Sequence, residues 1–125
     1  MKSHKDLEVW KKAIALAKSV YDLTKGLPRE ETYSLSDQMK RSAISIASNI
    51  AEGAARQTQK EFVQFLFIAL GSASELDTQV ELCKEISFEH VSGEKLDAIQ
   101  QELNIISKMI YGLITKVKQS VGTDH

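Results

Sequence analysis

Apolar residues recur every three or four positions in four segments of the chain, which is the period of one face of an α-helix. The last segment has the clearest register, because its apolar positions alternate steps of three and four from Leu96 to Val117, as in a coiled-coil seam. Four helices joined by short connections predict an all-α fold: an up-down-up-down antiparallel four-helix bundle that forms a single domain over residues 1–125. The expected helices span residues 6–25, 35–53, 59–86 and 93–120.

The boundaries of these helices carry recognisable end signals. Gly26 is placed for a left-handed C-cap of the first helix, and Pro28 prevents its continuation. Thr58 and Glu61 fit a capping box, in which the threonine hydroxyl accepts a backbone hydrogen bond and the glutamate reaches back. The expected N-cap residues of the second, third and fourth helices are Ser34, Thr58 and Ser92.

Two helices carry more apolar surface than one bundle face requires. The first has a second apolar stripe beside the one that contains Trp10, and the third is apolar around nearly its whole circumference over residues 62–70. This excess favours contact between copies of the chain, and the alternative is an unusually buried helix within one chain. Small residues at 71–74 would allow another helix to approach closely. The candidate interface residues are Val9, Leu16, Val63, Phe67 and Leu70.

A polar stripe runs along the second helix, opposite its apolar stripe. It is either a solvated face or a hydrogen-bonded network between helices or subunits, in which Arg41 pairs with Glu52 or with Glu75 of the third helix. The candidate members of this network are Gln38, Arg41, Ser45, Asn49, Glu52 and Glu75.

Composition narrows the class of protein without identifying its task. With 125 residues, 42% hydrophobic and 26% charged, the chain fits one soluble domain, and its net charge of -1 shows no overall basic field. No signal peptide is evident, and the longest apolar run is too short to span a bilayer, so we expect a cytoplasmic protein with no membrane partner.

Candidate catalytic chemistry is sparse. The single cysteine, Cys83, is expected to be a small core or interface residue, and no role is assigned to His4, His90 or His125. No metal-ligand set, phosphate-binding glycine loop or nucleophile and base pair is evident. We therefore expect no cofactor, no metal and no enzymatic activity.

The best candidate for contact with nucleic acid is a group of basic residues that the sequence predicts to flank the junction of the second and third helices. A helix N-terminus there would favour anions. The region 58–91 carries two basic and six acidic residues, so this surface should avoid that side. The candidate nucleic-acid-binding residues are Lys40, Arg41, Arg56 and Lys60.

Several segments together resemble a known family. They are Asp6-Leu7-Glu8-Val9-Trp10, Val20-Tyr21, Asp37-Gln38, Arg41-Ser42-Ala43, Ser45-Ile46, Ser48-Asn49-Ile50-Ala51-Glu52-Gly53, Glu61-Phe62, Gly71-Ser72 and Glu75-Leu76. The pattern is similar to the four-helix bundle proteins encoded within intervening sequences of bacterial 23S ribosomal RNA genes, also described as ribosomal-protein-like. The resemblance covers residues 6 to about 80 and implies a ring-like homopentamer without enzymatic activity. It also implies similarity to the accessory variability determinant of diversity-generating retroelements, a basic protein that binds nucleic acid and a reverse transcriptase.

Two functions remain open on the sequence. The chain is either a homo-oligomeric module associated with RNA or DNA, or a homo-oligomeric scaffold that binds another protein and no nucleic acid.

Overall fold

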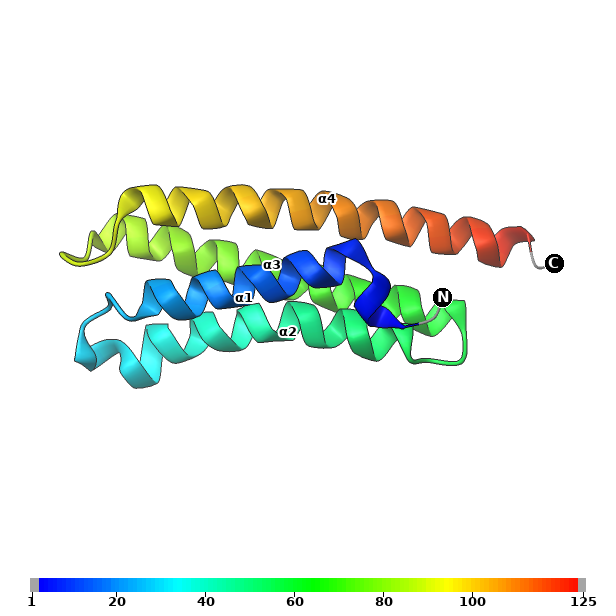
Figure 1. The fold of residues 1–125 in the computed structure, drawn as a ribbon, viewed down its shortest axis with the longest axis horizontal. Coiled ribbons are helices and arrows are strands. Elements are labelled where there is room, and N and C mark those ends of the chain that lie inside the picture. Colours follow the sequence, from blue (N-terminus) through cyan, green and yellow to red (C-terminus); the bar gives the residue numbers. More distant parts are fainter. Residues whose placement is uncertain (1–2, 124–125) are drawn as a thin grey trace.

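Four long helices lie side by side along one axis (Figure 1). The structure, a computed structural model, describes residues 3–123. The helices are α1 (Glu8–Thr24), α2 (Asp37–Ala54), α3 (Gln59–Ile86) and α4 (Gly93–Thr123), and no strand occurs within the described residues. Consecutive helices run in opposite directions, so both chain ends and the α2–α3 turn lie at one end of the bundle. The predicted up-down-up-down arrangement of four helices is confirmed.

The helices share one core. Each helix contributes its stripe of apolar residues that recur at helical spacing. The largest side chains buried from solvent include Leu16 of α1, Met39, Ile46 and Ile50 of α2, Leu66 and Leu76 of α3, and Ile106 and Ile110 of α4. Burial of such side chains is the main force that holds the four helices together. No described helix has an apolar stretch long enough to cross a membrane.

The candidate interface residues require a correction. Val9, Leu16, Val63 and Leu70 are buried in the core of a single chain, and only Phe67 stays on the surface, with 46% of its area exposed. The stripe of α1 that faces inward is the aliphatic one. Trp10 and Tyr21 belong to the other stripe, which lies at the edge of the bundle, where an aromatic ring can stay partly in water. The inward stripe of α1 is therefore occupied by the core and is not free for contact between copies.

Two of the three predicted N-caps are confirmed. The backbone amide of Glu61 donates to the Thr58 hydroxyl over 3.1 Å, and that hydroxyl donates to the Glu61 carboxylate over 2.9 Å. At the start of α4, the backbone amide of Lys95 donates to the Ser92 hydroxyl over 3.3 Å. These caps satisfy amides that the helix itself leaves without acceptors.

Two other predicted end signals are wrong: the N-cap at Ser34 and the left-handed C-cap at Gly26. Ser34 lies inside a π-helical turn, Thr32–Ser36, and its hydroxyl donates to the Glu31 carboxylate, so α2 begins later, at Asp37. Gly26 does not adopt a positive φ. A Cβ at this position would lie 2.3 Å from the carbonyl oxygen of His90, so the glycine admits the α3–α4 connector rather than reversing the chain.

Candidate functional site

The four predicted nucleic-acid-binding residues do not form one site. Lys40 and Arg41 lie near the start of α2, whereas Arg56 follows its end, about 24 Å away at the usual rise per residue. Arg41 forms an ion pair with Asp37 at 2.9 Å, and the ammonium of Lys40 lies 5.0 Å from the centre of the Tyr21 ring. The prediction that all four flank the α2–α3 junction is therefore wrong, because α2 separates them by almost its full length.

Arg56 and Lys60 do lie together, at the α2–α3 turn. The guanidinium of Arg56 pairs with Glu52 at 2.6 Å and lies 4.6 Å from the centre of the Phe65 ring. Lys60 lies in the first turn of α3 and is exposed. The turn thus presents two cations beside a helix N-terminus, where anions are favoured.

A third cation joins this end of the bundle from α4. The ammonium of Lys118 lies 5.4 Å from the centre of the Phe67 ring, on the third turn of α3. Sequence reasoning missed Lys118 because only the antiparallel packing of α4 against α3 brings positions 67 and 118 together. Two phenylalanine rings on different sides of α3 near its start therefore each lie beside a basic group: the partly buried ring of Phe65 and the exposed ring of Phe67.

Charge is divided along the long axis of the bundle. The half that contains the chain ends and the α2–α3 turn, here called the basic half, comprises residues 3–16, 46–72 and 108–123, with eight basic and four acidic residues. The opposite half, called the acidic half, comprises residues 17–45 and 73–107, with seven basic and twelve acidic residues. The net charge of -1 conceals this separation. The basic residues of the basic half are Lys5, Lys11, Lys12, Arg56, Lys60, Lys108, Lys116 and Lys118.

The polar stripe on α2 forms a smaller network than predicted. The hydroxyls of Ser45 and Ser72 lie 2.7 Å apart across α2 and α3, and the Asn49 amide donates to the Ser45 hydroxyl over 3.0 Å. Within one chain, Arg41 pairs with Asp37 and with neither predicted partner, and Glu52 pairs with Arg56. The two remaining candidates, Gln38 and Glu75, are exposed.

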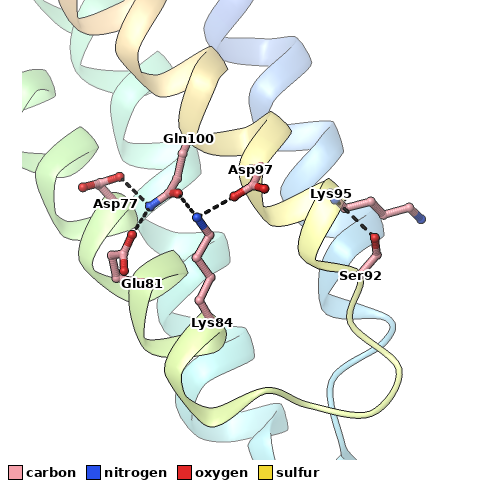
Figure 2. A network of polar contacts seen from close by, with 7 residues as sticks. All are labelled: Asp77, Glu81, Lys84, Ser92, Lys95, Asp97 and Gln100. Atoms are coloured by element: carbon pink, nitrogen blue, oxygen red, sulfur yellow. Dashed lines mark hydrogen bonds and ion pairs between the residues drawn. The ribbon is translucent and has the colours of Figure 1, made fainter.

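A second polar network, which the sequence did not reveal, joins α3 to α4 (Figure 2). The Gln100 amide donates to Asp77 over 3.2 Å and to Glu81 over 2.8 Å, and its oxygen accepts a hydrogen bond from the Lys84 ammonium. Lys84 also pairs with Asp97, and this hydrogen bond raises the pKa of the ammonium above its usual value. These contacts fasten the two helices near their connector.

The residues weighed for catalysis lie apart. The Cys83 thiol is buried 3.7 Å from the Met39 sulfur, and burial, followed by the charge of Glu31, raises its pKa to about 11. His4 packs edge-on against Trp10, and His90 is exposed in the α3–α4 connector. His125 lies outside the described residues. Among residues 3–123, no three His, Cys, Asp or Glu side chains gather as metal ligands would.

Comparison with known proteins adds two findings. Residues 5–112 match the family model described as 23S rRNA-intervening sequence protein. The fold is similar to a crystal structure from Bacteroides thetaiotaomicron, described as a protein with unknown function from the S23 ribosomal protein family. That likeness has a TM-score of 0.75 and 31% sequence identity, and it covers 85% of this chain and 97% of the other. The comparison with curated proteins gives no match.

Proposed function

The chain belongs to the family of 23S rRNA-intervening sequence proteins, and from this premise we propose that it is a non-enzymatic, homo-oligomeric module of the cytoplasm that contacts nucleic-acid phosphates through its basic half. The observation that carries the proposal is the separation of charge along the bundle. Eight basic residues against four acidic ones give one half a positive field despite the net charge of -1.

Phosphate contacts depend on local positive charge rather than on the charge of the whole chain. The α2–α3 turn supplies Arg56 and Lys60, and α4 supplies Lys118 at the same end. The ring of Phe67, which is exposed, lies beside Lys118, and an exposed aromatic side chain offers a stacking surface to an unpaired base. The acidic half would repel a phosphate backbone, so it orients the bundle with its basic half toward the nucleic acid.

Assembly of several copies would strengthen such an interaction. Each basic half offers few phosphate contacts, and copies joined in one particle bind a single strand with a high effective concentration. Large apolar side chains that remain exposed on α1 and α3, such as Ile14 and Ile68, support self-association.

The test is a titration of RNA and DNA with the assembled protein across a series of salt concentrations. We expect binding that weakens steeply with salt, because phosphate contacts release counterions. The double variant Arg56→Glu/Lys60→Glu should weaken binding by at least about tenfold and lower the slope of log K against log salt by about one to two.

A matched control separates local charge from net charge. Arg29→Glu/Arg41→Glu makes the same change in net charge on the acidic half, and it should leave the affinity within about twofold. Equal losses from both double variants would show that the basic half is not the binding surface. Absence of binding at low salt would remove the nucleic-acid function.

The second candidate function is a homo-oligomeric scaffold that binds another protein and no nucleic acid. The exposed apolar residues of α1 and α3 favour it independently of the basic half. An oligomeric protein that binds neither RNA nor DNA would support the scaffold, whereas a monomer at micromolar concentration would count against it.

A further inference from the structure

We propose that α1 of one copy docks on α3 of the next, through two partly exposed strips whose apolar side chains match and whose charged residues are opposite in sign. This inference rests on the homo-oligomeric part of the proposed function and names the surfaces that make the contact. The α1 strip comprises Trp10, Ile14, Ala17 and Tyr21 with Lys18 and Lys25 at its edge. The α3 strip comprises Ile68, Gly71, Leu82 and Ile86, with Glu75 on the same face and Glu85 at its edge.

The α3 strip faces away from the core, whereas the α1 strip lies at the edge of the bundle, where Trp10 and Ala17 are partly buried against the core. Ile14 and Tyr21 expose 45% and 43% of their area, and Ile68, Leu82 and Ile86 expose about half of theirs. On α3, positions 68, 71, 75, 82 and 86 share one helical face at steps of three, four and seven residues. Exposed aliphatic side chains in such a row are costly to leave in water, so each strip favours a partner.

The charged edges decide which partner fits. Lys18 and Lys25 are exposed and form no ion pair with any other described residue, and the same is true of Glu75 and Glu85. A contact of α1 with α1 would set lysines against lysines, and a contact of α3 with α3 would set glutamates against glutamates. Only α1 against α3 places opposite charges together, so a second copy of this chain is complementary to the first.

The two strips also occupy matching positions along the long axis of the bundle. The helices α1 and α3 run in the same direction in the bundle (Figure 1). Tyr21 of α1 lies beside Lys40 of α2. Met39 of α2 contacts Cys83 of α3, and Ser45 of α2 contacts Ser72 of α3. The position of Tyr21 along the bundle axis therefore corresponds to about residues 77–82 of α3. Two neighbouring copies that stand parallel and unshifted therefore bring Lys18 close to Glu75 and Lys25 close to Glu85, within about one helical turn.

Gly71 adds a steric fit at the centre of the contact. A Cβ built on this residue would meet no atom within 4 Å apart from its chain neighbours and the nearby helix backbone, so α3 has a notch there on its outer face. When the two copies stand parallel and unshifted, this notch lies opposite the large side chain of Ile14 on the neighbouring copy. A bulky residue packed over a glycine lets two helices approach closely.

Such a contact has consequences for the whole assembly. It joins two different surfaces, so each copy can bind one neighbour on each side, and the contacts form a ring where the rotation between copies closes and an open filament where it does not. All copies then point in the same direction, which gathers every basic half on one face of the assembly and every acidic half on the other.

The test measures particle mass by light scattering for the wild type and three charge variants. Lys18→Glu/Lys25→Glu makes both strips negative, and Glu75→Lys/Glu85→Lys makes both positive, so each should weaken assembly by at least about tenfold. The variant with all four changes exchanges the signs and should assemble again. An equimolar mixture of the two double variants should form mixed oligomers in which the variants alternate, because each favourable contact then joins a negative strip of one variant to a positive strip of the other.

Matched controls change the same number of charges elsewhere. Lys12→Glu/Lys108→Glu and Glu89→Lys/Glu94→Lys should leave the mass unchanged, and helical circular dichroism should show that every variant folds. An oligomeric wild type whose mass none of the charge variants alters would overturn the docking surfaces and leave the homo-oligomer standing. A wild type that is monomeric at tens of micromolar would overturn both.

Discussion

At the scale of single residues, the glycines show how one side chain can be required by a neighbour that is distant in sequence. A Cβ on Gly53 would lie 2.7 Å from the Cβ of Phe65, so α2 and α3 approach closely where they leave their shared turn. Gly26 performs a similar task against the carbonyl of His90. Both glycines stand near predicted helix ends, and the sequence suggested only that they end helices.

Replacing Gly53 tests this interpretation. Alanine is the better helix former by about 1 kcal/mol, but the crowded site should impose about 1–3 kcal/mol of strain, so Gly53→Ala should lower the free energy of unfolding on balance. Gly112→Ala is the control, because a Cβ there meets no atom of another part of the chain within 4 Å, and it should raise stability by about 0.5–1 kcal/mol. Urea unfolding measures both, and a stabilising Gly53→Ala would contradict the close approach.

At the scale of elements, local contacts determine where a helix begins, and polar contacts between helices join one helix to the next. The capping box at Thr58 sets the start of α3 where the sequence placed it, because both partners lie within one turn. The network of Gln100 with Asp77, Glu81 and Lys84 instead joins residues that lie 16 to 23 positions apart. Such a contact depends on how α3 and α4 pack.

Gln100 is the central residue of that network, and its removal should be measurable. Gln100→Ala removes three hydrogen bonds and leaves the carboxylates of Asp77 and Glu81 without their shared donor. Because these groups are largely exposed, the loss should be moderate, about 0.5–1.5 kcal/mol in urea unfolding. Gln101→Ala, at the exposed neighbouring position, should change stability by less than about 0.5 kcal/mol. Equal effects would show that the network does not stabilise the α3–α4 pair.

At the scale of the whole molecule, one core and one charge gradient organise the bundle. The core spans all four helices, so its innermost residues become accessible only when the bundle opens. The gradient runs along the same axis, from the basic half at the chain ends to the acidic half at the other two connectors. The proposed functions use this axis: one face of an assembly for nucleic acid, and the sides of each bundle for neighbouring copies.

Cys83 can report on the opening of the bundle. Its thiol is 1% exposed, and burial raises its pKa from 9.0 to about 11, so in the folded chain it is both inaccessible and protonated at pH 9. We expect alkylation at pH 9 to be slower than in the urea-unfolded chain by at least about a hundredfold. The rate should rise with denaturant in step with the loss of helical circular dichroism. Rapid labelling of the folded chain would show that α2 and α3 separate locally around this residue.

Much of the fold could be predicted from the sequence because its causes are local. The apolar period, the capping box at Thr58 and the cap at Ser92 act within a few residues, and they determined four helices, their order and most of their ends. The candidate site was predicted only in part. Arg56 and Lys60 lie close in sequence and in space, whereas Lys40 and Arg41 are separated from them by the length of α2.

The sequence by itself thus determined what each helix is and that four of them pack as a bundle. Only the tertiary structure decided which of the two α1 stripes faces inward, which aromatic ring Lys118 lies beside, and that charge is divided between the two ends. The physical reason is that periodicity fixes a helix and its faces through neighbours three and four residues away. Rotation and level relative to the other helices depend on contacts between positions far apart in the chain.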